Sequence, residues 1–178
     1  YGCIVERTVP FNLPTRCFSG TITATPTTAT VCKGNAVQLS YTSGNLPAEC
    51  NIVSYRWMRN NVTVATTTSN SFPAMLPGVY TVEIVSNTNC RYLSPNFITP
   101  IFTPLPSLTL SGPTTLCQGE DAYLSVTTNA SLIEWTMNNV VIGTQDFISL
   151  PNLPLGFHTV SVKVTENGCE KTASQTFE

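Results

Sequence analysis

The sequence predicts an all-β chain in which two β-sandwich units follow one another, preceded by a single extra strand. One motif occurs twice: a Cys-x-Gly turn, an alternating strand, a tryptophan, a strand that begins at glycine, and a closing cysteine. The first copy runs from Cys32 to Cys90 and the second from Cys117 to Cys169. Short alternating runs between turn residues are typical of sandwich strands, and no segment shows the 3.6-residue period of a helix.

Composition narrows the class of protein further. Charged residues make up 10% of the 178 residues and the net charge is −2, so no basic surface is expected for nucleic acid. No apolar run approaches the ~18 residues that a membrane span needs. No signal peptide is visible, so we expect a mature product or an excised piece. Seven cysteines in register with the repeat favour disulfides and an oxidising compartment.

The strands of the first unit follow from its alternating runs. Apolar and polar residues alternate over 37–41 and again over 80–84. Tyr55 and Trp57 lie on the strand between these runs, and Asn60-Asn61 after it predicts a hairpin turn.

The second unit repeats this order, with an alternating run at 122–126 and a strand that carries Trp135. A turn at Asn138-Asn139 and the alternating run 158–164 follow. The two copies align without gaps at an offset of 85 from Cys32 onward and at an offset of 78 from Trp57 onward. The first unit therefore carries about seven extra residues, and they include Cys50.

Prolines at 100, 104 and 106 predict an extended linker between the units. We therefore expect units at 15–103 and 104–178. At roughly 75–85 residues, such units often need covalent stabilisation.

The segment 1–14 matches only the end of a motif copy. Phe11 follows Cys3 by eight residues, as Phe177 follows Cys169. The segment is therefore predicted to be the last strand of a preceding or neighbouring unit. Either the chain was cropped from a longer array, or the strand inserts into a neighbouring molecule and polymerises it by strand addition. The residues that would be donated are Ile4, Val5, Val9 and Phe11.

Position within the repeat suggests how the cysteines pair. Each copy has one cysteine before its second strand and one after its sixth, which predicts Cys32–Cys90 and Cys117–Cys169. Cys17 and Cys50 belong to features that the second unit lacks, which predicts Cys17–Cys50. Cys3 is left unpaired or bonded to another unit. One conflict stands: immunoglobulin topology would place the paired cysteines near opposite ends, so either the strand order differs or a pairing is wrong.

These motifs carry a resemblance to a known class of repeats. The residues 113–119, Trp135, Gly156 and Gly168-Cys169 resemble the immunoglobulin-like or PKD-like repeats of large secreted Bacteroidota proteins. These proteins include SprB-type gliding adhesins and other cargo of type IX secretion. The resemblance implies tandem immunoglobulin-like β-sandwiches at the cell surface, acting in adhesion, gliding motility or filaments. His158, Asn89 and the insertion around Cys50 depart from the pattern, which puts a shared ligand in doubt.

Few residues suggest catalysis or metal binding. His158, the single histidine, occupies the position of Tyr80, where a packed, hydrogen-bonded ring is expected rather than a catalytic base. Glu120 and Asp121 follow a turn glycine and read as a solvated turn, with a calcium site as the alternative. The cysteines lack the close CxxC spacing of zinc ligands. We therefore expect no enzyme activity, no metal and no cofactor.

Trp57 and Trp135 are predicted to be core anchors, because each sits where a sandwich buries its central tryptophan. The leading hypothesis is a non-catalytic structural segment of an extracellular adhesin or filament. The alternatives are a filament subunit that polymerises through residues 1–14, and a carbohydrate-binding module of a secreted enzyme. The expected partners are neighbouring repeat units, identical subunits and surface polysaccharide.

Overall fold

The computed structural model describes residues 19–44 and 50–178, whose strands form two units. Unit 1 contains the described residues up to Val31 together with Ala36–Ile101; unit 2 contains Cys32–Asn35 and Phe102–Glu178. The predicted extra strand at 1–14, with Cys3, and the predicted disulfide partner Cys17 lie outside the described residues. The described residues contain strands and no helix.

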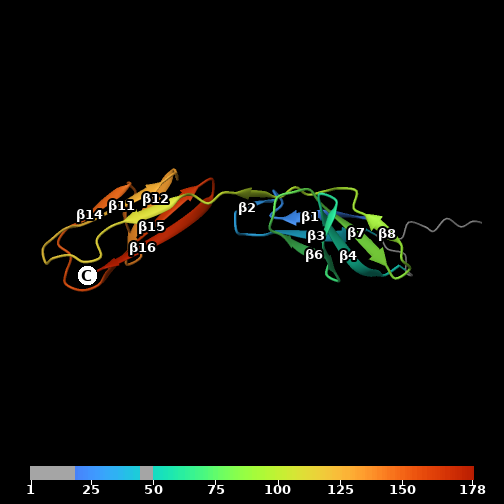
Figure 1. Ribbon diagram of the computed structural model, residues 1–178, viewed down its shortest axis with the longest axis horizontal. Coiled ribbons are helices and arrows are strands. Elements are labelled where there is room, and N and C mark those ends of the chain that lie inside the picture. Colours follow the sequence, from blue (N-terminus) through green and yellow to red (C-terminus); the bar gives the residue numbers. More distant parts are fainter. Residues whose placement is uncertain (1–18, 45–49) are drawn as a thin grey trace, which may run out of the picture. The chain divides into compact units, whose positions relative to one another are not determined.

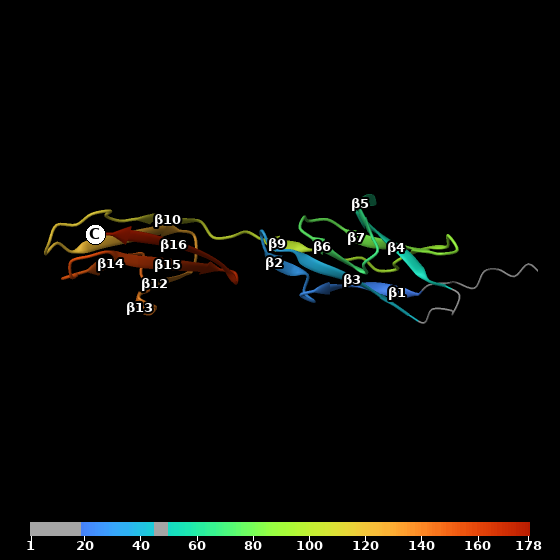
Figure 2. The ribbon, with the colours of Figure 1, turned by 90° about the horizontal axis from the view of Figure 1, so that it is seen from below.

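Unit 1 is a sandwich of two antiparallel sheets, and Figure 2 shows β1 and β3 in one layer and β4 and β5 in the other. The three-stranded sheet has the order β1 (Gly20–Thr25), β3 (Val37–Ser43), β6 (Ser71–Ala74). The four-stranded sheet has the order β5 (Val62–Thr67), β4 (Ile52–Arg59), β7 (Tyr80–Ser86), β8 (Arg91–Leu93).

Unit 2 has the same strand order (Figure 1). Its three-stranded sheet consists of β10 (Leu108–Ser111), β11 (Ala122–Thr128) and β14 (Phe147–Leu150). Its four-stranded sheet has the order β13 (Val140–Gly143), β12 (Leu132–Met137), β15 (His158–Glu166), β16 (Cys169–Phe177). The predicted fold class, tandem immunoglobulin-like β-sandwiches, is confirmed.

The segment predicted to be a plain linker contains a further strand. β9 (Ile101–Thr103) pairs with β2 (Thr30–Cys32) in a separate two-stranded sheet. Pro100 and Pro104 flank β9, and a proline has no backbone N–H to donate to a ladder. The prolines therefore mark the two ends of this strand and do not prevent it from forming.

Each sandwich is built around one tryptophan. Trp57 and Trp135 are 0% exposed, as expected of core anchors. Trp57 Nε1 donates a hydrogen bond to Thr67 Oγ1 at 3.1 Å, and Trp135 Nε1 donates to the Gln145 carbonyl at 2.7 Å. The acceptor stands ten residues after the tryptophan in both units, so each indole keeps its polar N–H satisfied inside an apolar core.

The strand alternation of the sequence becomes the inside and outside of each sandwich. In β7 every second residue from Tyr80 to Ser86 is buried, and in β11 the buried residues are Ala122, Leu124 and Val126. Successive side chains of a strand point to opposite faces, so one face of each sheet is available for the core.

The predicted hairpin turns are confirmed. Asn60 and Asn61 have φ values of 50° and 63°, and Asn138 and Asn139 have values of 53° and 62°. Two consecutive left-handed residues make a type I′ turn, whose twist matches that of the strands. A register shift follows each tryptophan, between Trp57 and Met58 and between Trp135 and Thr136. The same local device therefore builds both units.

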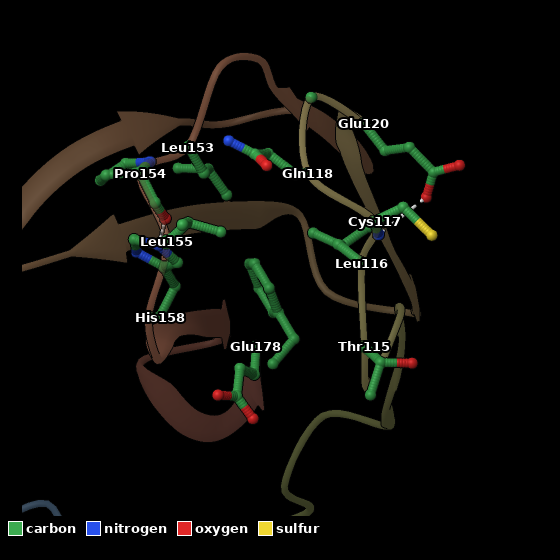
Figure 3. Close-up of a pocket in the computed structure, with 13 residues that line it drawn as sticks. Thr115, Leu116, Cys117, Gln118, Glu120, Leu153, Pro154, Leu155, His158 and Glu178 are labelled. Atoms are coloured by element: carbon green, nitrogen blue, oxygen red, sulfur yellow. Dashed lines mark hydrogen bonds between the residues drawn. The ribbon is translucent and has the colours of Figure 1, made fainter.

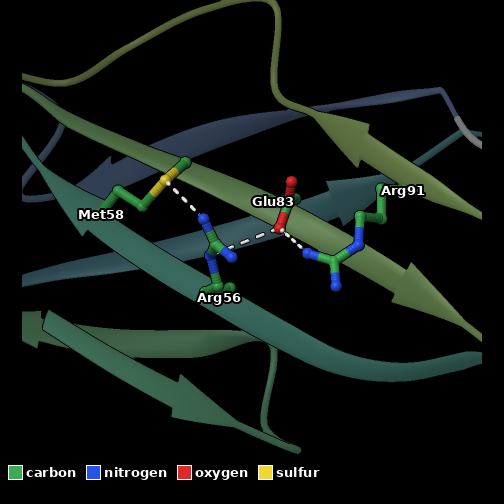
Figure 4. A network of polar contacts seen from close by, with 4 residues as sticks. All are labelled: Arg56, Met58, Glu83 and Arg91. Atoms are coloured by element: carbon green, nitrogen blue, oxygen red, sulfur yellow. Dashed lines mark hydrogen bonds and ion pairs between the residues drawn. The ribbon is translucent and has the colours of Figure 1, made fainter. Parts of the chain in front are cut away.

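A cluster of charged side chains lies on the four-stranded sheet of unit 1 (Figure 4). Glu83 Oε2 is 3.3 Å from Arg56 Nε and accepts a hydrogen bond from Arg91 Nη1 at 3.0 Å. Arg56 and Glu83 are opposite one another in the register of β4 and β7, so the ion pair follows from strand pairing. Because the side chains of Arg56 and Arg91 are 38% and 58% exposed, solvent screens the ion pairs and this cluster adds little to stability.

Ionisation of the buried Tyr41 side chain is predicted to lower the stability of unit 1 at alkaline pH. The side chain is 2% exposed, and burial, then the neighbouring Tyr92 and Tyr55, raise its pKa to about 12. The folded pKa lies above the unfolded value of 10, so the stabilisation is complete below about pH 10 and is lost as pH rises through about 12. We expect the free energy of unfolding of unit 1 to fall by about 3 kcal/mol across this window.

The measurement is urea unfolding as a function of pH, with Trp135→Phe so that Trp57 reports unit 1. Tyr41→Phe should remove most of the decline between about pH 10 and pH 12, and the remainder belongs to Tyr55, whose pKa is also raised by burial. Tyr123→Phe, at an exposed tyrosine, is the control and should keep it. An unchanged decline in Tyr41→Phe would contradict the assignment.

Candidate functional site

The cysteines form the most specific feature of the described chain. Cys32 is bonded to Cys169, with an S–S distance of 2.08 Å and a Cα–Cα distance of 5.6 Å. Among the described residues Cys90 and Cys117 are free thiols. The predicted pairs Cys32–Cys90 and Cys117–Cys169 are therefore wrong. Cys50 is disulfide-bonded, and its predicted partner Cys17 lies outside the described residues.

The strands explain why the predicted pairs cannot form. Cys32 precedes the end of β3 that pairs with Ala74, whereas Cys90 follows the far end of β7. The seven residues of β7 span roughly 20 Å, but the Cα atoms of a disulfide lie within about 7 Å. In unit 2 the nine residues of β15 separate Cys117 from Cys169 in the same way. The conflict between the predicted disulfides and immunoglobulin topology is therefore explained by wrong cysteine pairs and not by a different strand order.

A tight turn presents Cys32 to its partner. Asn35 N donates to the Cys32 carbonyl at 3.0 Å, and Gly34 has φ 102°, a value that side-chain-bearing residues rarely adopt. Lys33 N donates to the Thr103 carbonyl at 2.7 Å, which fixes the turn to the end of β9. The residues Cys32–Asn35 group with unit 2, so this turn and its disulfide belong to that unit.

A hairpin presents Cys169. Asn167 and Gly168 have φ values of 51° and 76°, and this left-handed pair brings Cys169 opposite Glu166 at the start of β16. A hollow of about 480 Å³ lies beside the disulfide, and its lining includes Lys33, Leu105 and Glu170. A basic side chain of the turn and an acidic side chain of the hairpin therefore line one hollow.

The second copy of the motif builds the same turn around Cys117. Glu120 N donates to the Cys117 carbonyl at 3.0 Å, and Gly119 has φ 86°. Glu120 Oε2 in turn accepts a hydrogen bond from Cys117 N at 3.1 Å. The carboxylate considered as a calcium ligand thus closes the turn. No group of three or more His, Cys, Asp or Glu side chains that could hold a metal occurs in the part of the chain that the structure describes.

A hollow of about 520 Å³ lies at the Cys117 end of unit 2 (Figure 3). Residues 115–120 line one side of it, and the loop 153–156, His158 and the end of β16 line the other. Figure 3 shows the Cys117 sulfur pointing away from Leu155 and His158, with Leu116 directed inward. The thiol is exposed at the rim of an open, partly apolar hollow.

His158 holds the loop beside this hollow. Its Nε2 donates to the Pro154 carbonyl at 2.7 Å, and its ring centroid lies 6.0 Å from that of Phe177. Tyr80 makes the equivalent bond in unit 1, where its hydroxyl donates to the Leu76 carbonyl at 2.9 Å. The packed, hydrogen-bonded ring expected from the repeat is confirmed.

Burial of both tryptophans removes them as sugar-stacking platforms. Other aromatic residues are exposed, and among them Tyr123 on β11 and Phe147 on β14 are 66% and 58% exposed. Tyr123 is paired with Ser149 and Phe147 with Ser125, so both rings project from the outer face of one sheet. Sequence reasoning missed them, although Tyr123 stands at an outward position between the buried Ala122 and Leu124.

Comparison with known proteins adds fold likeness and no family. No protein-family model matches the chain, and no curated protein matches it. Murine CEACAM1b shares 17% identity over 90% of this chain and 99% of its own, with a TM-score of 0.37. The fibronectin(III)-like modules of Clostridium thermocellum CbhA share 14% over 88% and 93%, with a TM-score of 0.39. An amphioxus IgVJ-C2 molecule shares 14% over 83% and 98%, with a TM-score of 0.38.

Within the described residues, no helix is long and apolar enough to cross a membrane.

The Cys32–Cys169 bond should stabilise the oxidised protein measurably. It closes a loop with a sequence separation of 137, and disulfides of this kind contribute about 2–4 kcal/mol. We expect Cys32→Ser and Cys169→Ser each to lower the free energy of unfolding of unit 2 by this amount, measured by urea unfolding. Cys117→Ser, at a free thiol in the equivalent turn, should change it by less than about 0.5 kcal/mol. An equal loss in Cys117→Ser would contradict this prediction.

Proposed function

We propose that the chain is a structural segment of an extracellular surface adhesin or filament, in which disulfide-closed sandwich units carry tension. The observation that supports this proposal is the disulfide between Cys32 of the first motif copy and Cys169 of the second. A disulfide also fits an oxidising compartment outside the cytosol. The sequence resemblance to SprB-type adhesins supports the finer proposal of a bacterial surface protein secreted by the type IX route and used in adhesion or gliding.

The position of the bond gives tension a short covalent path. Force applied at the two ends of the chain passes from Cys32 directly to Cys169, so the backbone between them is not stretched. β3 through β15 all lie between these two cysteines in the sequence. The strands that carry both buried tryptophans are therefore shielded from extension as long as the bond is intact, whereas β1 and β16 lie outside the closed loop.

Polymerisation by donation of the strand at 1–14 concerns residues outside those described, and it stays a prediction.

Stretching a single molecule tests the proposed mechanical role. Pulled from its ends, the oxidised chain should extend without releasing residues 33–168. Reduction should release a further contour length of roughly 480 Å at about 3.5 Å per residue. Cys32→Ser should release a shorter length, because the disulfide of Cys50 still closes its own loop. Cys117→Ser should behave as the unsubstituted chain. Full extension of the oxidised chain would overturn the proposal.

A second candidate function is binding of a surface polysaccharide, and the exposed pair Tyr123 and Phe147 favours it. Rings on an open sheet face can stack on sugars, and Ser125, Ser149 and Thr127 lie on the same face as hydrogen-bonding groups. Because Tyr123 corresponds to Gln38 in unit 1, this platform belongs to unit 2 alone.

Glycan-array binding of the whole chain tests the second candidate. The double variant Tyr123→Ala, Phe147→Ala should lose at least about 2 kcal/mol of binding free energy, since stacking contributes on the order of 1 kcal/mol per ring. The matched control is Val62→Ala, Val140→Ala, at exposed apolar residues on the edge strands β5 and β13. Equal losses in both variants, or no glycan bound by the unsubstituted chain, would exclude this function.

A further inference from the structure

The observed disulfide joins particular positions of two motif copies, and the same positions of the repeat contain two further cysteines that are free thiols. The bond joins the leading cysteine of one motif copy, Cys32, to the trailing cysteine of the next copy, Cys169. Among the described residues, the remaining leading cysteine is Cys117 and the remaining trailing cysteine is Cys90, and both are free thiols. Cys3, which the sequence places at the end of a motif copy, lies outside the described residues. The same rule would join Cys117 to a trailing cysteine, and Cys90 to a leading cysteine, on another molecule.

The leading cysteines are structurally equivalent. In both turns the residue three positions on donates its N–H to the cysteine carbonyl at 3.0 Å, and a glycine with positive φ stands between them. A Cβ on Gly34 or on Gly119 would meet nothing within 4 Å. Cys117 therefore sits in a turn that already has the geometry in which Cys32 is bonded, and its sulfur is exposed.

The trailing cysteines correspond in the strand that follows them, although Cys90 is half-buried and its sulfur accepts a hydrogen bond from Thr88 Oγ1 at 3.5 Å. Cys90 precedes Ile98 by eight residues, and Ile98 pairs with Tyr80. Cys169 precedes Phe177 by eight residues, and Phe177 pairs with His158, the counterpart of Tyr80. The residue before each cysteine is left-handed, with φ 61° at Asn89 and 76° at Gly168.

Charge favours one combination of the open cysteines. At the bonded pair, Lys33 follows the leading cysteine and Glu170 follows the trailing one, and both line the same hollow. At the open pair the signs are reversed, since Glu120 and Asp121 follow Cys117 in its turn and Arg91 follows Cys90. Arg91 is 58% exposed and its partner Glu83 also contacts Arg56, so positive charge remains available beside Cys90. An acidic turn is complementary to this basic hairpin.

We propose that Cys117 and Cys90 are the two open halves of one repeated cross-link, and that Cys117 of one molecule bonds Cys90 of a second copy of this chain. The contact is head-to-tail, so each added copy presents a fresh Cys117 or Cys90 and the assembly grows as a linear polymer. The inference deepens the proposed structural function by naming its partner, and it rests on that function for its use.

The bond forms by two thiol–disulfide exchanges with a small disulfide such as oxidised glutathione. The Cys117 thiolate attacks one glutathione sulfur, which forms a mixed disulfide and releases one glutathione thiolate. The Cys90 thiolate of the second copy then attacks the Cys117 sulfur, which forms the protein–protein disulfide and releases the second glutathione. The two released thiolates take up the two protons that the cysteines lost. The two cysteines are oxidised, and one glutathione disulfide is reduced to two thiols.

The test uses the full chain in a glutathione redox buffer, with non-reducing electrophoresis and peptide mapping by mass spectrometry. Cys3→Ser is present in every sample, because that cysteine lies outside the described residues. The chain with Cys90 and Cys117 intact should give a ladder of polymers. Cys90→Ser alone and Cys117→Ser alone should stay monomeric, and their equimolar mixture should give a dimer and nothing larger.

Peptide mapping should identify Cys117 bonded to Cys90 of the other molecule. Cys117–Cys117 or Cys90–Cys90 dimers, a Cys90–Cys117 bond within one monomer, or both thiols still reduced in folded protein would each overturn the inference. The geometric control moves the thiol by one position, with Cys117→Ser and Gln118→Cys. This variant should give no ladder of polymers. A ladder from this variant would show that any exposed thiol suffices and would overturn the inference.

Charge reversal tests the choice of partner. Arg91→Glu should slow the dimerisation of the Cys90 and Cys117 partners by about tenfold at low salt, and Asp121→Lys in the other partner should restore the rate. If Arg91→Glu leaves the rate of dimerisation unchanged, charge does not select the partner cysteine. The force extension of monomeric Cys90→Ser depends on the Cys32–Cys169 bond alone, so failure of the cross-link and failure of the mechanical function are distinguishable.

Discussion

The buried tryptophan of each sandwich is the constraint on which the other features depend. Its indole fills the space between the two sheets, and its N–H must find an acceptor there because an unpaired donor in the core is costly. The acceptor stands ten residues on, across a left-handed asparagine turn and a register shift. Tryptophan, turn and shift together fix where β4 and β12 begin and end, and so place every loop at one end of its sandwich or the other.

The positions of the strand ends determine which cysteines can bond to one another. Both cysteines of a motif copy lie at or near the ends of strands, and those ends are separated by the length of a strand of seven to nine residues. No side-chain motion shortens that separation, because the strands are paired along their full length. A cysteine in such a position cannot brace its own core. It can only react with a cysteine from another copy, and Cys32 with Cys169 shows that arrangement.

The sequence predicts the parts of this structure that depend on local periodicity. Alternation gives the strands, paired asparagines give the hairpins, and the shared position of Tyr80 and His158 gives a ring that bonds the loop four residues before it. Cysteine pairing is different, because position in a repeat says which residues are equivalent but not which copy supplies the partner. The β9 strand was missed for a related reason: proline spacing describes the backbone of a segment and not the strand it pairs with. Tyr123 and Phe147 were missed because their exposure depends on which face of the sheet meets the core.

The location of the cysteines also indicates why the chain has this disulfide: it connects motif copies and does not stabilise a core. A disulfide that serves a sandwich core lies mid-strand and packs on the tryptophan. In this chain Trp57 and Trp135 are fully buried in clusters that include neither Cys32 nor Cys169, so the Cys32–Cys169 bond is not part of either core. Cys117 is exposed and Cys90 is half-buried, and a chain that needed only stable units would gain nothing from free thiols in an oxidising compartment. Their register with the repeat, and the reversed charges beside them, are explained if the bond serves to join one copy to the next.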